Sequence, residues 1–119
     1  MVRIIKDVHS KEVLHRDIKP ANFCISKDAS PDDLSDGTEK IYLIDFGLSK
    51  SYTGRHGKHI PMLEEKKLVG TPRYCSLATH MGYEQSRRDD MEVIGNTLIY
   101  LLKGELPWED CPKATNKWE

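Results

Sequence analysis

Four side chains in two short stretches of the sequence are of types that could do chemistry together. Asp17, Lys19 and Asn22 share one stretch, and Asp45 stands at the end of the next apolar run. Carboxylate and amide oxygens are the ligands that hard divalent cations such as magnesium prefer. A carboxylate can also accept a proton from a hydroxyl group, and an ammonium group can bind an anion. These residue types therefore suit a site that combines a metal ion with proton transfer.

The spacing of these residues fits a known pattern. Residues 15–22, HRDIKPAN, match the catalytic-loop pattern H-R-D-x-x-x-x-N of protein kinases, and residues 45–47, DFG, stand where the metal-binding Asp of that pattern belongs. Each piece alone is a weak signal, because an isolated Asp-x-Gly is usually a turn and an isolated His-Arg-Asp is usually a surface loop with a local ion pair. Their order, with a predicted strand between them and a helix before them, favours the kinase interpretation.

The pattern gives each of the four side chains a role. Phosphoryl transfer needs little covalent help from a protein and mostly needs positioning and neutralisation of the phosphate charge. Asn22 and Asp45 would bind Mg²⁺ and through it ATP, while Asp17 would accept the proton of an attacking hydroxyl group. Lys19 would hold the transferring phosphate, and a lysine there resembles serine/threonine kinases more than tyrosine kinases. We therefore expect transfer to serine or threonine.

Hydrophobic periodicity predicts the elements that must position these residues. Apolar residues recur at helical spacing from Val2 to Val8 and predict a helix that begins with the first residue. Residues 22–26 and 41–44 each read as a short strand, and together they would form a hairpin that carries the two metal ligands. The acidic stretch 27–40 is predicted to be a solvated loop.

The second half of the chain is predicted to hold a long loop and one buried helix. Residues 48–68 show no sustained period and read as a surface loop of functional length. A helix is predicted over residues 90–103, with Asp89 or Asp90 as its cap and Gly104 as its stop. Its apolar residues cover more than one face, which predicts burial nearly all round. The predicted fold class is mainly α with a short β-hairpin (α+β).

Composition and charge argue against several other functions. The chain of 119 residues has 18 Lys plus Arg against 19 Asp plus Glu, so it lacks the basic excess that nucleic-acid binding needs. It has no apolar run of about 18 residues, so we expect no membrane span. The three widely spaced cysteines indicate reduced thiols and a cytoplasmic or nuclear location. His56 and His59 lie between cations, which favours a solvated loop over a metal site.

Several further motifs stand out along the chain. No Ala-Pro-Glu motif follows the DFG segment, and residues 84–90 read EQSRRDD. The other motifs are IDFGLSK at 44–50, HIP at 59–61, GTPRY at 70–74, TH at 79–80 and LPW at 106–108. Together they closely resemble the casein kinase 1 family over almost the whole chain, and the 84–90 stretch is specific to that branch.

The resemblance implies a protein-kinase-like fold, of which this chain is a C-terminal lobe fragment. On this interpretation residues 1–119 are a partial kinase domain with catalytic loop 15–22, DFG motif 45–47, activation segment 45–78 and buried helix 90–103. The N-terminal lobe is expected to be absent, because the chain has no G-x-G-x-x-G loop and no V-A-I-K strand. The resemblance also implies that the carboxylate of Asp90 holds the backbone of the catalytic loop.

The resemblance further implies which residues bind the substrate. Basic residues match the positions at which the casein kinase 1 family lines its substrate cleft, so we expect protein substrates that are acidic or already phosphorylated. The expected substrate-binding residues are Arg16, Lys50, Lys66, Thr71 and Arg73. An alternative is a truncated kinase lobe that binds partners without transferring phosphate.

The chain departs from the usual casein kinase 1 pattern at a few positions. Ala21 stands where that family usually has Asp, Pro72 where it usually has Ala, and residues 76–78 read SLA instead of SIN. None of these changes touches the four side chains assigned to catalysis. They bear on substrate preference, and a related branch such as the vaccinia-related or tau-tubulin kinases remains an alternative.

Overall fold

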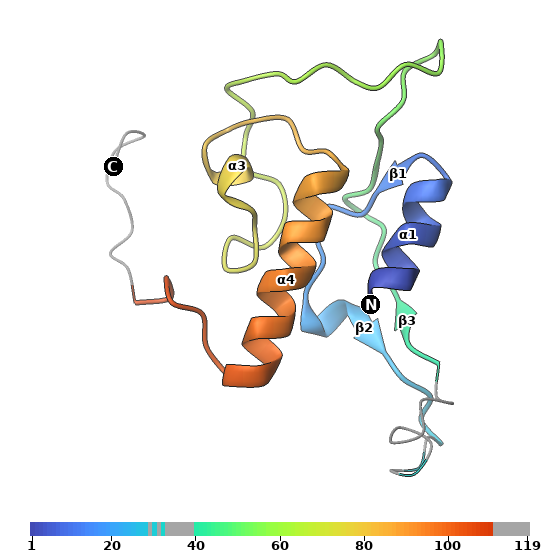
Figure 1. Cartoon of the computed structure of the whole chain (residues 1–119), viewed down its shortest axis with the longest axis vertical. Coiled ribbons are helices and arrows are strands. Elements are labelled where there is room, and N and C mark those ends of the chain that lie inside the picture. The colour runs from blue at the N-terminus through green and yellow to red at the C-terminus, as the bar shows by residue number, and fades with distance from the viewer. Residues whose placement is uncertain (29, 31, 33–39, 111–119) are drawn as a thin grey trace.

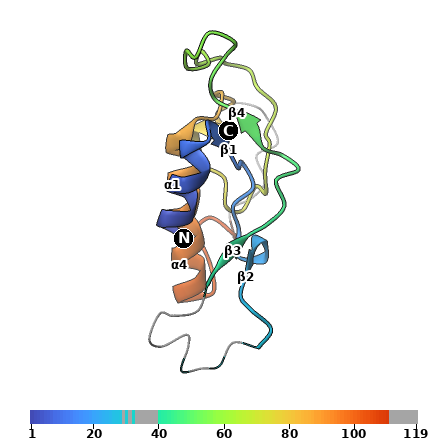
Figure 2. The same ribbon diagram turned by 90° about the vertical axis from the view of Figure 1, so that its right-hand side faces the viewer.

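The computed structural model describes residues 1–28, 30, 32 and 40–110, so most of the predicted acidic loop and Cys111 lie outside the described residues. Two longer helices, α1 (Val2–Ser10) and α4 (Arg87–Lys103), pack side by side (Figure 1), and the short helix α3 (Leu77–His80) precedes α4. A view turned by 90° shows α1 and α4 in one layer and the short strands beside it (Figure 2).

The strands form two small antiparallel pairs. They are β1 (Val13–Leu14) with β4 (Lys50–Ser51), and β2 (Phe23–Cys24) with β3 (Tyr42–Leu43), and a single 3₁₀ turn, Pro20–Asn22, leads into β2. The predicted hairpin is confirmed in its pairing, although each strand is shorter than 22–26 and 41–44 suggested. The prediction of a structureless loop over 48–68 is wrong at its start. Two-residue strands such as β4 are too short to show a period in the sequence.

The hydrophobic core lies between the two long helices and the catalytic loop. Helix α1 is amphipathic, as predicted, and it buries Ile5 against Ile94 of α4 and Ile18 of the catalytic loop. Val8 and Phe23 are partly buried against this cluster. Each of these large apolar side chains contributes roughly 1.5–3 kcal/mol when it is fully removed from water. The core therefore fixes the catalytic loop directly to both helices.

Helix α4 begins earlier than predicted. Its first residue is Arg87 and its N-cap is Ser86, not Asp89 or Asp90. Asp89 instead lies in the first turn, where its Oδ2 accepts the backbone N–H of Ser86 at 2.8 Å. An acidic side chain in this position satisfies a free N–H group at the helix start and interacts favourably with the helix dipole. Gly104 ends the helix in the left-handed conformation, as predicted.

The prediction that α4 is buried nearly all round is also wrong. Ile94 and Thr97 are buried, but Leu101 and Leu102 are 55% and 85% exposed. The buried face is the one that packs against α1 and the catalytic loop, and Leu101 and Leu102 lie outside it. In the described part of the chain, none of the helices has the length and apolar character needed to span a membrane.

Candidate active site

One buried carboxylate, from helix α4, binds the backbone of the catalytic loop. Asp90, in the first turn of α4 and 2% exposed, accepts the backbone N–H groups of His15 at 2.9 Å and Arg16 at 3.0 Å. It also accepts a bond from His9 Nε2 of α1 at 2.8 Å. A buried carboxylate is stable only when such donors replace water. The role that the resemblance implied for Asp90 is therefore confirmed, and His9 is an additional contact that sequence reasoning missed.

The backbone of the loop adopts an uncommon conformation at Arg16, and a glycine packs closely against it. Arg16 has φ = 67°, a left-handed value that few non-glycine residues adopt. Gly70 lies against it, and a Cβ atom at Gly70 would come within 2.5 Å of the carbonyl oxygen of Arg16. Only glycine fits there. This close approach brings the next residue, Thr71, onto the catalytic loop.

Asp17, Lys19 and Thr71 form one hydrogen-bonded unit. The hydroxyl of Thr71 donates to Asp17 Oδ1 at 2.7 Å and accepts from Lys19 Nζ at 3.0 Å. The same ammonium lies 3.2 Å from Asp17 Oδ2. Burial of the carboxyl disfavours its ionised form, but the bonds from Thr71 and Lys19 outweigh burial and hold the pKa of Asp17 below its ordinary value of 3.8. Asp17 is therefore a carboxylate at neutral pH, able to accept a proton.

His15 connects the catalytic loop to the DFG segment. Its Nδ1 accepts the backbone N–H of Asp17 at 3.2 Å, so Nε2 carries the proton and donates to the carbonyl of Ile44 at 3.0 Å. The imidazole also packs edge-on against the ring of Phe46, with 4.8 Å between centroids. These contacts fix the DFG segment next to the catalytic loop.

Asn22 and Asp45 are brought together by backbone pairing. The backbone N–H of Ile44 donates to the carbonyl of Asn22 at 2.9 Å, which places Asp45 beside it. The side-chain Nδ2 of Asn22 donates to the carbonyl of Asp17 at 2.7 Å, and Oδ1 accepts no bond among the described hydrogen bonds. Asp45, exposed and with φ = 62°, accepts only the N–H of Gly47 among the described hydrogen bonds. An amide oxygen and a carboxylate of this kind fit a Mg²⁺ ion.

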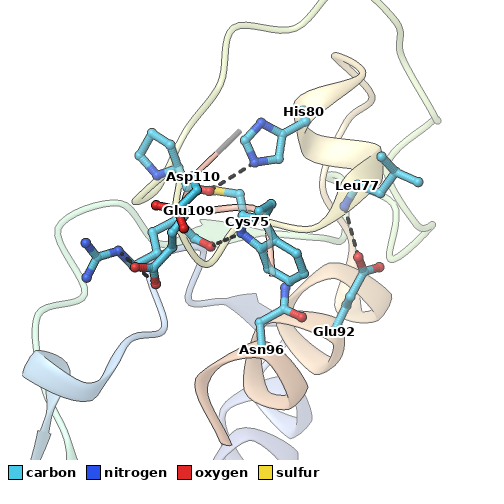
Figure 3. A pocket seen from close by; sticks show the side chains of 10 residues that line it. Cys75, Leu77, His80, Glu92, Asn96, Glu109 and Asp110 are labelled. Carbon is cyan, nitrogen blue, oxygen red and sulfur yellow. Dashed lines mark hydrogen bonds and ion pairs between the residues drawn. The ribbon is translucent and has the colours of Figure 1, made fainter. Parts of the chain in front are cut away.

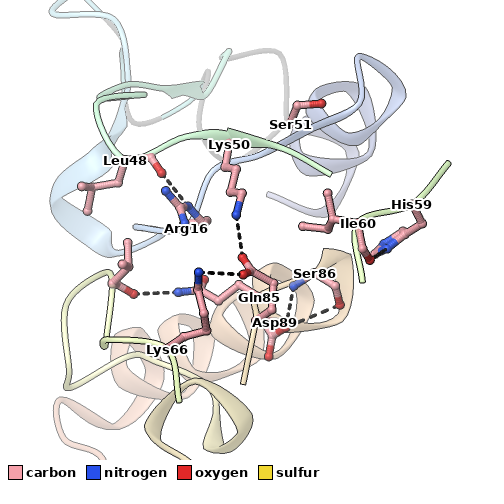
Figure 4. A network of polar contacts seen from close by, with 12 residues as sticks. Arg16, Leu48, Lys50, Ser51, His59, Ile60, Lys66, Gln85, Ser86 and Asp89 are labelled. Carbon is pink, nitrogen blue, oxygen red and sulfur yellow. Dashed lines mark hydrogen bonds and ion pairs between the residues drawn. The ribbon is translucent and has the colours of Figure 1, made fainter. Parts of the chain in front are cut away.

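The predicted basic residues fall into two groups. Arg16 Nε donates to the carbonyl of Leu48 at 2.6 Å (Figure 4). Lys50 and Lys66 meet at one carboxylate, that of Glu84, with Nζ atoms 2.9 and 3.2 Å from its two oxygens. Sequence reasoning missed Glu84, although it opens the EQSRRDD motif. The signal that could have identified Glu84 was its position, because it is an acidic residue that stands in a family motif between two basic segments.

Arg73 has different partners from the other three cations. Its Nε lies 3.5 Å from Glu109 Oε1 and its Nη1 lies 3.4 Å from the hydroxyl of Tyr100 on α4. The indole N–H of Trp108 donates to the backbone carbonyl of Arg73 at 2.8 Å. The structure therefore joins Lys50 and Lys66 at Glu84 and holds Arg16 at the carbonyl of Leu48. It turns the guanidinium of Arg73 toward the end of α4.

A cavity of about 840 Å³ opens beside the chain that follows Thr71 (Figure 3). Its polar groups bond to one another across the rim: His80 Nε2 contacts the carbonyl of Pro72 at 3.0 Å, and Asn96 Nδ2 donates to that of Tyr74 at 3.0 Å. The first bond lies within the 72–80 segment, and the second holds this segment on α4. Within the described ranges, no group of three or more His, Cys, Asp or Glu side chains is placed to hold a metal ion.

The loop, the neighbouring Asn22 and Asp45, and the Asp-Thr-Lys unit together match the residue pattern of a protein kinase. All of residues 1–119 match the family model described as "Protein kinase domain". The chain belongs to the protein kinases, and within them to the casein kinase 1 family, so the resemblance predicted from the motifs is confirmed.

Two relatives illustrate the match. The chain is 47% identical over 118 residues to casein kinase I homolog 2 of Saccharomyces cerevisiae. It is 45% identical over 118 residues to casein kinase I homolog 1 of Schizosaccharomyces pombe. Each alignment covers 98% of this chain but only 21% and 25% of the two relatives, so the chain spans a quarter or less of the length of these two proteins.

Proposed function

We propose that the protein transfers the γ-phosphate of ATP to serine or threonine hydroxyl groups of protein substrates. One observation carries this proposal: Thr71 bonds to both Asp17 and Lys19, at 2.7 and 3.0 Å. Asp17 would accept the proton of the substrate hydroxyl, and Lys19 would bind the transferring phosphate. Thr71, which contacts both groups, would sit at the point where the substrate hydroxyl arrives.

Asn22 and Asp45 are the residues that would hold Mg²⁺. The ion would neutralise charge on the phosphates of ATP. This chain would present two oxygen ligands from residues that flank the paired strands β2 and β3. The bond from Asn22 Nδ2 to the backbone carbonyl of Asp17 supports this, because it uses the amide nitrogen and not the oxygen of the side chain. We further propose that residues 1–119 are a C-terminal lobe fragment and that the N-terminal lobe is not among them.

The proposed substrates are proteins with acidic or phosphorylated sequences near the target residue. The meeting of Lys50 and Lys66 at Glu84 supports this, because charge-assisted hydrogen bonds to phosphate or carboxylate are strong. Lys66→Ala or Arg73→Ala is expected to raise KM for phosphorylated peptides and to spare unphosphorylated ones. A cytoplasmic or nuclear location, with neither nucleic acid nor membrane as partner, completes the proposal.

The proposal is tested by phosphate transfer in the protein expressed from its own gene. Asp17→Asn removes the proton acceptor with little change in volume, so transfer to a serine peptide is expected to be abolished while circular dichroism is unchanged. Asp45→Asn is expected also to weaken Mg²⁺-ATP binding. The matched control is Asp28→Asn, since Asp28 is exposed and lies outside the site.

Two outcomes would contradict this proposal. Near-normal turnover in a folded Asp17→Asn protein would remove Asp17 as the base. A wild-type protein that binds peptides but transfers no phosphate would instead favour the non-catalytic binding module.

A further inference from the structure

Glu84 is a buried acidic residue that lies between two lysine side chains. Its side chain is 4% exposed, and each carboxylate oxygen faces a different lysine, Lys50 of β4 and Lys66 of the activation segment. Figure 4 shows these two lysines converging from opposite sides on the chain just before α4. A single carboxylate therefore joins three segments that are distant in the sequence.

The contacts keep Glu84 ionised. Burial disfavours the charged form, but the hydrogen bond from Lys50 and the ammonium of Lys66 beside the other oxygen outweigh burial, and they hold the pKa of Glu84 below its ordinary value of 4.5. The side chains of Lys50 and Lys66 remain 36% and 42% exposed. Because an ammonium group has three N–H donors, each lysine keeps donors that can face a ligand in solvent.

We propose that Glu84 is a positioning residue that fixes Lys50 and Lys66 as a two-point clamp for the phosphate of a phosphorylated protein substrate. The inference rests on the proposed substrate class. Without Glu84 the two ammonium groups would repel each other, and their long side chains would regain rotamer freedom that binding must then remove. With it, both cations are held in place before the substrate arrives.

The clamp and a simple charge effect predict opposite changes in phosphate affinity when Glu84 loses its charge. Removing a negative charge from a basic group should strengthen the binding of an anion if only the net charge mattered. Removing the residue that fixes the two cations should weaken it. The clamp therefore predicts that Glu84→Gln lowers phosphopeptide affinity even though the site becomes more positive.

The experiment measures binding without catalysis. A fluorescent phosphoserine peptide and its unphosphorylated form are titrated, by anisotropy and without ATP, into the protein expressed from its own gene. Glu84→Gln is expected to weaken phosphopeptide binding about tenfold, the loss of one charge-assisted contact, and to leave the unphosphorylated peptide unaffected. The matched control is Glu64→Gln, which removes the same charge from an exposed position near Lys66 and should change either affinity less than about twofold.

Each outcome decides between the clamp and its alternatives. Phosphopeptide binding by Glu84→Gln that equals or exceeds wild type overturns the clamp, and so does an equal loss for both peptides, which would indicate a purely structural role. If Glu84→Gln does not fold, Glu84→Asp keeps the charge but is one methylene shorter, and undiminished phosphopeptide affinity in that variant overturns the clamp as well. A wild-type protein with no preference for the phosphopeptide would instead remove the proposed substrate class, and the clamp with it.

Discussion

The carboxylate of Asp90 and the backbone N–H of His15 form a buried hydrogen bond of 2.9 Å between residues 75 positions apart. The adjacent N–H of Arg16 binds the other oxygen of the same carboxylate at 3.0 Å. Helix α4 thus binds the backbone of the catalytic loop at its start, and this contact does not depend on the side chains of His15 and Arg16. The geometry of the proposed base, Asp17, therefore depends on Asp90, a buried residue of another element.

Asp90→Asn is expected to destabilise the fold by about 3 kcal/mol, because an amide has one acceptor oxygen for the three donors that now share a carboxylate. Urea denaturation measures the change. Asp7→Asn, an exposed substitution on α1, is the control and should stay within about 0.5 kcal/mol of wild type. Equal stability of the two variants would show that the Asp90 contacts contribute little.

Acid should weaken the fold through Asp17 and Glu84. The folded-state pKa lies below the ordinary value of 3.8 for Asp17 and of 4.5 for Glu84. As the pH falls, the unfolded chain therefore binds protons at these groups before the folded chain does. The stability from these groups is fully present above the ordinary values and is lost as pH falls through the lowered ones. Urea denaturation between about pH 3 and 7 should show this loss, and Glu84→Gln should make it smaller. A pH profile unchanged by Glu84→Gln but altered by Glu64→Gln would contradict the assignment.

Cys75 should resist alkylation. Burial, followed by the charges of Asp17 and Asp89, raises the pKa of Cys75 to about 11, so only about one thiol in a thousand is a thiolate at pH 8. Treatment with iodoacetamide and peptide mapping should find Cys24, which is partly exposed, modified before Cys75. Unfolding in urea is the control and should remove the difference. Rapid labelling of Cys75 in the folded protein would show that this region opens readily.

The 119 residues expressed alone should associate and lack kinase activity. Helix α4 has an exposed apolar face, formed by Leu98 (41% exposed), Leu101 (55%) and Leu102 (85%). An apolar face of this kind favours self-association. Leu102→Lys should reduce association in sedimentation experiments, with stability changed by less than about 0.5 kcal/mol. Met62→Lys, the same kind of change at a 63% exposed residue outside α4, is the control. A monodisperse wild-type monomer that binds nucleotide tightly would contradict this prediction.

The sequence by itself determined the residue types and the local elements of this protein. The HRD and DFG motifs are contiguous, so Asp17, Asn22 and Asp45 could be named without a structure, and the helical spacing of apolar residues placed α1 and most of α4. Local signals of this kind repeat every few residues and remain visible in one dimension. The same reasoning located the strands around Asn22 and Asp45, with errors only at their ends.

Only the tertiary structure decided the contacts between distant residues. The partners of Asp90 lie 74 to 81 positions away, and Glu84 meets Lys50 across 34 positions. A single long-range pair leaves no period in a sequence, and any of the chain's 18 lysines and arginines could have been the partner of Glu84. The exposed face of α4 was hidden for a related reason: periodicity shows that a face is apolar, but what packs against it depends on how the rest of the chain folds.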